Sequence, residues 1–263
     1  MVVIGLLIGG IFGGVEIVRN ARLVGTVSQV KAYSTALTTF RDMYNATPGD
    51  MPTAGQKLVG CPGAAGAGCN PFVVAAPTVG NAGDKFIGTT NWATAWGAPA
   101  TTTTGGSTGP VNLDGERYLF WVHLVLSNLV AGVLPDGASS ATTLTLEITN
   151  PSAKTGGGFV AGYGSGAIGP GAAGFQIVNT GVTGTILVQM SDPTLALQTT
   201  SGALPLTPLH AAQLDAKMDD GAPTTGDVQA YGVGASCFTS AVAKTYDKTV
   251  ATSDCGLIYH IGN

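Results

Sequence analysis

Four aspartates in the last quarter of the sequence are the residues whose type and spacing come closest to a ligand-binding set. Asp215, Asp219, Asp220 and Asp227 fall within one short segment. Carboxylate oxygens and backbone carbonyls are the ligands that Ca²⁺ prefers, and a cation would offset negative charge at a helix C-terminus. The spacing is not that of a regular calcium-binding loop, so a solvated turn is the simpler interpretation. The segment is a candidate calcium site, with a plain turn as its alternative.

The residue types used in catalysis are present, but they are not arranged for it. His123, His210 and His260 are far apart in sequence, and no Gly-x-Ser-x-Gly motif surrounds a serine. The glycines at 156–158 are not followed by Lys-Ser or Lys-Thr, as a phosphate-binding loop requires. His123 lies in an apolar segment, where a packed core histidine is the simplest explanation. We expect no catalytic site and no cofactor.

Composition gives no support to one large class of partners, the nucleic acids. Charged residues are 10% of the chain, the net charge is -4, and Lys and Arg form no cluster. Nothing therefore favours binding to nucleic acid. Hydrophobic residues reach 44%, so the chain can bury a core, and the 40 glycines indicate many turns and loops.

The cysteines fall into two local pairs, Cys61 with Cys69 and Cys237 with Cys255. Neither pair has the Cys-x-x-Cys spacing of a zinc or redox motif, and no histidine lies at ligand spacing. Four cysteines allow three pairings, of which the two local ones close the shortest loops. We expect disulfides at both pairs, and hence an oxidising compartment outside the cytosol. Buried free thiols are the alternative.

A low-complexity tract at residues 101–109 should lie on the surface. Its hydroxyl side chains are candidate O-glycan carriers, with an unmodified loop as the simpler interpretation. These candidates are Thr101, Thr102, Thr103, Thr104, Ser107 and Thr108.

The elements that position these residues begin with one long helix. Residues 1–15 carry no charge, residues 16–44 are amphipathic, and Pro48 and Gly49 end the helix. The amphipathic part has an apolar stripe at helical spacing, which we expect to pack on the chain's own domain. The stripe consists of Leu23, Val27, Val30, Leu37, Phe40 and Tyr44. We therefore divide the chain into a stem, residues 1–48, and a globular domain, residues 49–263.

The apolar part of the stem is rich in glycine. Its 15 residues are fewer than the roughly 20 that span a bilayer, so it is either a core helix or part of a longer segment. Glycines four residues apart let helix backbones approach closely in an apolar setting. Each costs about 0.5–1 kcal/mol in a helix relative to alanine, so packing or lipid must compensate. The glycines are Gly5, Gly9, Gly10, Gly13 and Gly14.

The remaining pattern predicts an α+β fold, in which the long helix packs on an antiparallel β-sheet domain with large loops. Further helices are expected at 114–129 and from the Thr207-Pro208 cap to about 218. Alternating or apolar segments between glycine-rich turns predict the strands. They are residues 142–149, 158–163, 175–179, 185–190, 227–231 and 257–261.

Residues 1–52 resemble the N-terminal helix of type IV pilins and type II secretion pseudopilins; they read MVVIGLLIGGIFGGVEIVRNARLVGTVSQVKAYSTALTTFRDMYNATPGDMP. The segments ERYLFWVHLVLSNLVAG and LTPLHAAQLDAKMDDGAPTTGDVQAYG and the second cysteine pair also resemble a subset of pilin-like proteins. In that family a short stretch bearing Phe, Ser and Glu opens the helix after a cleavage site. The chain begins with residues that match the part of the family's helix after this stretch, so we expect the Phe, Ser and Glu residues to precede Met1.

The resemblance implies a structural subunit of an extracellular type IV pilus-like filament on the cell surface, with cell adhesion among the roles of such fibres. The stem would lie in the inner membrane before assembly and among identical stems afterwards, with the pilus or secretion assembly machinery as a further partner. Its five glycines would form packing surfaces, and Glu16, Arg19 and Arg22 would form salt bridges between subunits. A minor pilin or pseudopilin is one alternative. A membrane-anchored secreted binding domain or hydrolase is another, from a different class.

Overall fold

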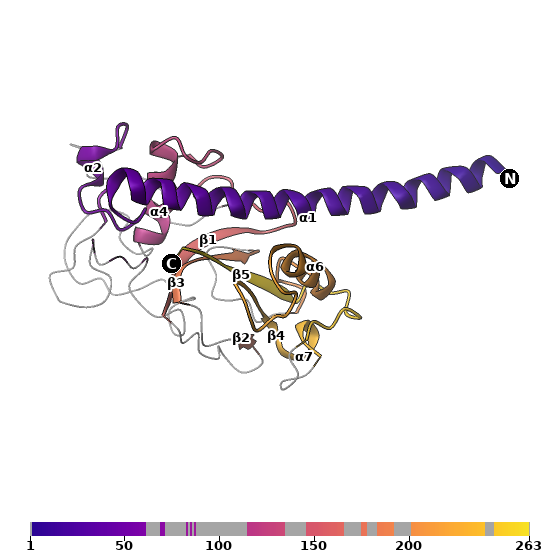
Figure 1. Ribbon diagram of the computed structural model, residues 1–263. Helices are drawn as coiled ribbons and strands as arrows, with labels where there is room; N and C mark the ends of the chain where they lie inside the picture. The colour runs from indigo at the N-terminus through magenta and orange to yellow at the C-terminus, as the bar shows by residue number, and fades with distance from the viewer. Residues whose placement is uncertain are drawn as a thin grey trace.

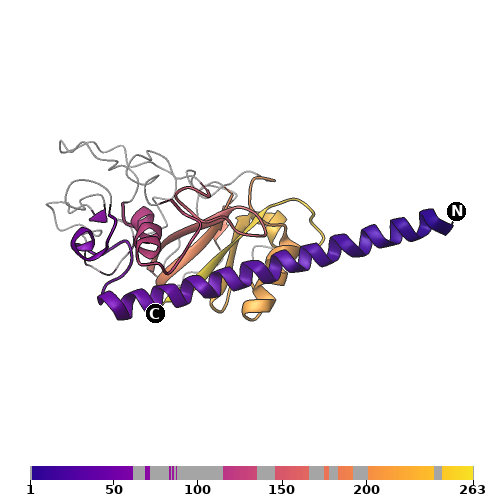
Figure 2. The ribbon, with the colours of Figure 1, turned by 90° about the horizontal axis from the view of Figure 1, so that it is seen from above.

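A single helix of 43 residues, α1 (Val2–Tyr44), runs along one side of the molecule and continues beyond it. The computed structural model describes residues 2–61, 69–71, 83, 85, 87, 115–134, 146–165, 175–177, 183–191, 201–239 and 245–262. In Figures 1 and 2 the end of α1 near Tyr44 lies against the domain, while the other end projects away from it. The predicted stop is confirmed: Gly49 has φ +89°, and a Cβ there would lie 2.2 Å from the carbonyl oxygen of Glu116. Glycine is therefore required at this turn.

The domain is built on one antiparallel sheet with the strand order β1-β3-β5-β4-β2. Its strands are β1 (Gly158–Ser165), β2 (Phe175–Ile177), β3 (Thr183–Met190), β4 (Val228–Val233) and β5 (Cys255–Gly262). The central strand is β5, which pairs with β3 on one side and with β4 on the other. It also contacts the stem, where the Ser34 hydroxyl donates to the carbonyl oxygen of Ile261 (3.1 Å). The predicted α+β fold, a long helix packed on an antiparallel sheet, is confirmed.

Two longer helices besides α1 lie at different points along the stem. Helix α4 (Gly115–Leu126) lies near the Tyr44 end of the stem, and α6 (Pro208–Met218) lies beside the stem closer to where it leaves the domain. The predicted cap of α6 is present, since the Thr207 hydroxyl accepts a hydrogen bond from the His210 amide (3.3 Å). The described residues also form two single-turn helices, α2 (Ala54–Lys57) and α7 (Gly234–Cys237).

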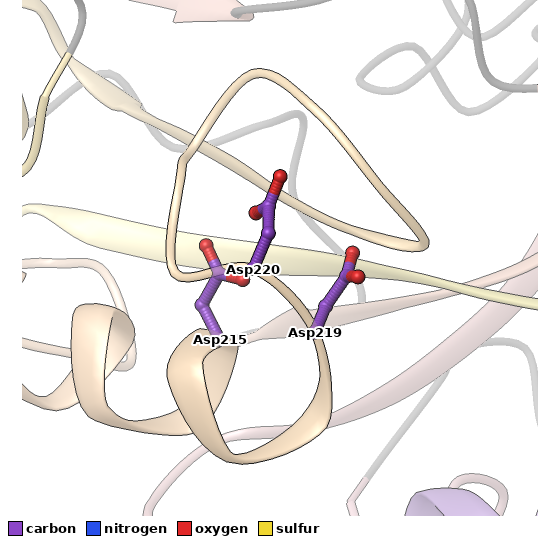
Figure 3. Close-up of side chains that lie close together, drawn as sticks. All are labelled: Asp215, Asp219 and Asp220. Atoms are coloured by element: carbon purple, nitrogen blue, oxygen red, sulfur yellow. The ribbon is translucent and has the colours of Figure 1, made fainter.

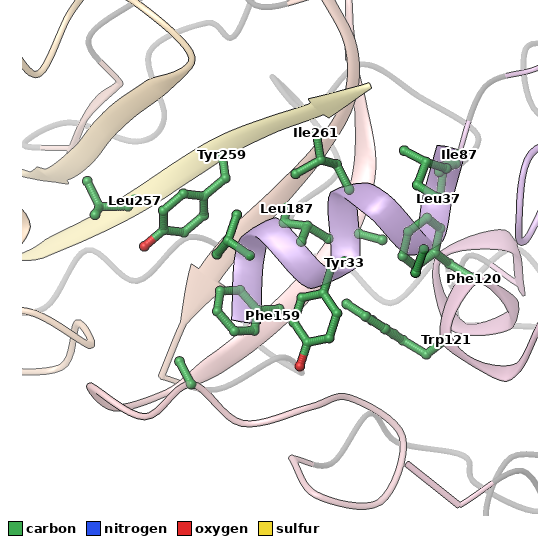
Figure 4. Packing of buried hydrophobic residues seen from close by; sticks show 14 of the residues in the cluster. Tyr33, Leu37, Ile87, Phe120, Trp121, Phe159, Leu187, Leu257, Tyr259 and Ile261 are labelled. Carbon is green, nitrogen blue, oxygen red and sulfur yellow. The ribbon is translucent and has the colours of Figure 1, made fainter. Parts of the chain in front are cut away.

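One apolar cluster joins the stem to the domain (Figure 4). The predicted stripe is confirmed: Leu23, Val30, Leu37 and Phe40 are at most 3% exposed, and the other two stripe residues are half-buried against the same cluster. Tyr33 adds edge-on contacts, with ring centroids 5.0 Å from Trp121 and 5.5 Å from Phe159. Each buried side chain of this size stabilises the fold by about 1.5–3 kcal/mol relative to exposure.

A second, polar connection crosses from the stem to the sheet, and we call it the polar seam. It consists of Thr26, Gln29, Thr155, Gln189 and Tyr259. The Thr155 amide donates to the Thr26 hydroxyl (3.1 Å), and the Gln29 amide group donates to the carbonyl oxygen of Ser152 (3.0 Å). Gln189 Nε2 donates to Thr155 Oγ1 (3.0 Å), and Gln189 Oε1 accepts from the Tyr259 hydroxyl (2.8 Å). The seam fixes the position of the stem along its axis, because hydrogen bonds are directional where apolar contacts are not.

Both expected cysteine pairs are joined. Cys61 bonds to Cys69, with their Cα atoms 5.7 Å apart, and Cys237 bonds to Cys255, with their Cα atoms 5.2 Å apart. The second disulfide connects α7 to the first residue of the central strand. It therefore ties the segment between β4 and β5 to the middle of the sheet.

The strand predicted at 142–149 is wrong over its described part. Residues 147–149 form a turn flanked by a bridge between Leu146 and Asn150. Glu147 has φ +68°, and its amide donates to the carbonyl oxygen of Asn150 (2.7 Å). Asn150 is fully buried and donates from its side chain to the carbonyl oxygen of Phe159 (2.9 Å). This local hydrogen bonding outweighs the alternating pattern, since asparagine competes well for backbone partners in turns.

Candidate functional site

The half of the stem that projects from the domain has an exposed apolar surface. Among the stem side chains that the structure describes, from residue 14 on, Leu23 is the first in the core, and residues 14–22 are all exposed. Val15, Ile17 and Val18 are 54%, 72% and 53% exposed. Apart from the backbone of α1 itself and the residues next to Gly14, no described atom lies within 4 Å of the position of a Cβ on Gly14. The stem therefore presents here a surface that the described part of its own domain leaves uncovered.

The expected packing glycines all lie on this helix. Gly5, Gly9, Gly10 and Gly13 fall within α1, as does Gly14. At four-residue spacing, 5, 9 and 13 share one face of a helix, and 10 and 14 share the next. Across the described residues, no helix combines the length and the apolar character needed to cross a membrane.

The charged residues expected to bridge subunits lie at the start of the amphipathic half. Arg19 Nη1 and Glu16 Oε2 are 3.4 Å apart, one turn apart on the same exposed face. Such a pair stabilises the helix by about 0.3–0.5 kcal/mol at most. Arg22 lies one turn further along and is also exposed. All three side chains are thus available at the surface, and Glu16 and Arg19 also pair within one chain.

A cavity of about 660 Å³ lies between this part of the stem and α6. Val15, Val18 and Leu23 form an apolar wall, while Arg19, Arg22 and His210 supply polar groups. Burial lowers the pKa of His210, and the nearby Arg19 charge lowers it further, against the opposing effect of Glu16. The cavity is therefore amphipathic, with two guanidinium groups at the junction between stem and domain.

The three histidines do not come together. His123 is buried beside the turn that ends the stem, His210 lines the stem cavity, and His260 Nδ1 lies 3.3 Å from Asp227 Oδ1. The expectation of a packed core histidine at 123 is confirmed: Nδ1 accepts from the Gly49 amide (2.8 Å) and Nε2 lies 2.8 Å from the carbonyl oxygen of Cys69. With Nδ1 accepting, the ring is the neutral tautomer that carries its proton on Nε2.

Three of the four aspartates proposed as calcium ligands meet in one turn (Figure 3). Carboxylate oxygens of Asp215, Asp219 and Asp220 all lie within 4.8 Å of one another. Asp227 is instead the partner of His260. The oxygen-only donor set suits a hard cation such as Ca²⁺.

The same carboxylates also hold the turn together by hydrogen bonds. Asp215 accepts from the Gly221 amide (3.1 Å) and the Tyr246 hydroxyl (2.7 Å). Asp220 accepts from the Ala222 amide and the Thr225 hydroxyl, and Asp219 accepts from the Val228 amide (3.2 Å). Five of the six carboxylate oxygens are thus already acceptors for the chain itself. The geometry of the turn is explained without a cation, as the alternative interpretation requires.

Asp215 is the unusual member of this acidic turn, because its side chain is fully buried. Burial raises its pKa to about 6, with smaller raising effects from Asp220 and Asp219, against the lowering effect of the hydrogen bonds from Tyr246 and Gly221. For Asp220, the hydrogen bonds from Thr225 and Ala222 lower the pKa of the exposed carboxyl. Asp215 therefore carries a charge that folding disfavours at neutral pH.

We expect Asp215→Asn to stabilise the chain at neutral pH. A folded-state pKa above the unfolded value means that the carboxyl contributes most stability below about pH 4 and that this contribution is lost as pH rises through about 6. The free energy of unfolding of the variant, minus that of the parent, should therefore increase by up to about 3 kcal/mol from pH 4 to pH 7.5. Urea unfolding at both pH values, in a chelator, measures the difference.

The exposed Asp219→Asn is the matched control for this prediction, because it changes the same charge in the same turn. Ca²⁺ added to the parent at pH 7.5 distinguishes the two interpretations of the acidic turn. A rise in unfolding midpoint that Asp215→Asn abolishes would support a bound cation, whereas no rise would support a plain turn. A parent and an Asp215→Asn variant with parallel pH profiles would contradict the prediction.

Sequence reasoning missed the polar seam. Thr26 and Gln29 lie next to the apolar stripe, and nothing local shows that Thr26 is fully buried against Thr155. Two polar residues three positions apart beside an apolar stripe would indicate such a hydrogen-bonded contact only if the residues that they bond to in the domain were already known. The glycan candidates Thr101, Thr102, Thr103, Thr104, Ser107 and Thr108 lie outside the described residues.

Comparison of the chain with protein-family models, with curated proteins and with solved structures found no match. The projecting stem is then the feature from which a function can be inferred.

Proposed function

We propose that this chain is a structural subunit of an extracellular type IV pilus-like filament. Before assembly the stem is held at the inner membrane; afterwards it packs among the stems of identical subunits. The observation that carries the proposal is the exposed apolar half of α1, on which Val15, Ile17 and Val18 find no cover from the described part of the domain.

The cost of leaving this surface in water supports assembly. Apolar surface contributes about 25 cal/mol for each Å² removed from water, so a helix of this length with several half-exposed valines and isoleucines gains substantially from a partner. The stem is also rigidly tied to its domain by the apolar cluster and the polar seam. A rigid arm can place its domain at a fixed distance from the axis of a fibre, whereas a flexible tether cannot.

The glycines suit the same role. They weaken an isolated helix, yet five of them stand at small-residue spacing on neighbouring faces of α1. Close approach of helix backbones, which such faces permit, compensates for that weakness within a bundle of stems. Both disulfides are suited to a subunit displayed outside the cytosol.

Electron microscopy of the assembly prepared from producing cells tests the proposal. The parent should form continuous fibres. Ile17→Lys should reduce the yield of fibres at least tenfold, because a lysine would be buried at the centre of the helix bundle. The unfolding midpoint of the domain should not change, since Ile17 lies outside the core.

Leu134→Lys is the matched control, because Leu134 is 58% exposed and belongs to the globular domain, in the segment that follows α4. It should leave the fibres intact. Isolated monomers from the parent, or normal fibres from Ile17→Lys, would reject the proposal. Short assemblies in place of fibres would favour the minor pilin or pseudopilin alternative.

A further inference from the structure

The cavity between the stem and α6 combines an apolar wall with cationic side chains. Its apolar wall is Val15, Val18 and Leu23, which lie on the face that runs into the uncharged half of the stem. Arg19 and Arg22 flank this wall, and the Thr155 residue lines the cavity with them. The cavity therefore offers cationic donors beside an apolar wall, a combination that matches an anionic amphiphile.

The local charge supports this match. The whole chain is acidic at -4, yet residues 16–31 contain three basic side chains and one acidic one. Glu16 forms an ion pair with Arg19 (3.4 Å) and offsets one of the three positive charges, so the segment keeps a net positive charge. Phosphate diesters are bound by guanidinium groups through charge-assisted hydrogen bonds, and arginines flanking an apolar helix commonly lie at headgroup level.

We propose that this cavity binds the headgroup of an anionic phospholipid, with Arg19 and Arg22 on the phosphate and the valine wall against the first part of the acyl chains. The inference rests on the proposed function, because it concerns the subunit while it is held at the membrane. The site sets the depth of the stem: the domain stops where the two arginines meet the headgroups. Release of the lipid then frees the same face of the stem for packing.

Vesicle binding of the full chain tests the inference. The parent should bind phosphatidylcholine vesicles containing phosphatidylglycerol more tightly than vesicles of phosphatidylcholine alone. Arg19→Gln or Arg22→Gln should each lower that preference about fivefold, and the double variant more. Lys31→Gln is the matched control: it removes the same charge from an exposed position more than a Debye length further along the helix, so it should preserve the preference.

A second measurement reports on the site itself. In bicelles, phosphatidylglycerol should raise the pKa of His210, which lines the cavity, whereas inorganic phosphate at the same concentration should not. An equal effect of inorganic phosphate would overturn the lipid assignment in favour of a free anion. Equal binding to both vesicle types, or equal losses in Lys31→Gln and the arginine variants, would overturn the site.

The outcomes separate this inference from the proposed filament. If the arginine variants lose lipid preference but still form fibres, both proposals stand. If they lose fibres while keeping lipid preference, the occupant of the cavity is a second copy of the chain and the lipid site is rejected. If the parent shows lipid preference but forms no fibres, only the filament is rejected.

Discussion

Replacing Gln189 by leucine should lower the free energy of unfolding by about 3–5 kcal/mol. Gln189 is fully buried at the centre of the polar seam. Its Nε2 donates to Thr155 Oγ1 (3.0 Å) and to the carbonyl oxygen of Gly156 (2.7 Å), and its Oε1 accepts from Tyr259 (2.8 Å). Leucine has a similar volume, so the loss comes from partners left without a hydrogen bond in the interior. Urea unfolding followed by the fluorescence of the buried Trp121 measures it.

Gln213→Leu provides a matched control on α6. The buried Oε1 of Gln213 accepts no hydrogen bond from the described part of the chain. The same substitution there should change stability by less than about 1 kcal/mol or increase it. Hydrogen exchange adds a second readout, because the seam ends on Thr26: in Gln189→Leu the stem amides near this residue should exchange faster. Equal losses in the two variants would mean that the seam contributes little.

The second large effect concerns acid. Between pH 7 and pH 4 the parent should lose about 3 kcal/mol of stability through His123 alone. Burial lowers the pKa of this imidazole to about 4, opposed in part by its hydrogen bond to the carbonyl of Cys69. Below about pH 6.5 the imidazole of His123 binds a proton in the unfolded chain but not in the folded chain. The contribution of His123 to stability is therefore fully present above this pH and is lost as pH falls towards 4.

His123→Gln tests this directly. Gln can still donate to Cys69 but offers nothing equivalent to Nδ1, so the Gly49 amide loses its acceptor and the variant should be less stable at pH 7.5. Its stability should then fall less steeply than that of the parent between pH 6.5 and 4. The imidazole signal of His123 in the NMR spectrum of the parent should remain that of the neutral ring down to about pH 4. Titration of this signal near pH 6.5 would refute the prediction.

Local patterns predicted the helices well because their causes are local. The stripe from Leu23 to Tyr44 identified the face of α1 that packs on the domain, and the Thr207-Pro208 pair identified the start of α6. The cysteine pairs were predictable for a similar reason: short loops favour nearby partners.

The sheet was only partly predictable. All five strands lie in segments where a strand was predicted, yet nothing in those segments specifies that β5 lies between β3 and β4. Strand order depends on pairings between residues far apart in sequence, such as Val188 with Ile258. The turn at 147–149 failed for a related reason, because Asn150 is bonded to Phe159, a partner that no short window includes.

The acidic turn shows the same limit at a candidate site. Proximity in sequence placed Asp227 with the other aspartates, whereas the backbone between Asp220 and Val228 turns it towards His260. The burial of Asp215 depends on Tyr246, which arrives from beyond β4. Neither fact is visible in the composition of the segment.

The place of β5 has a consequence for how the chain is made. Among the five strands it is the last in sequence, and it is the one that joins β3 to β4. During translation the stem is therefore made before β5, the strand on which it packs. The hydrogen bond from Ser34 to Ile261 can form only after most of the chain has been synthesised. Contacts this far apart in sequence form late and leave apolar surface unprotected meanwhile. The stem is therefore open to misassembly until β5 has been made, so the topology constrains the timing of folding as well as its end point.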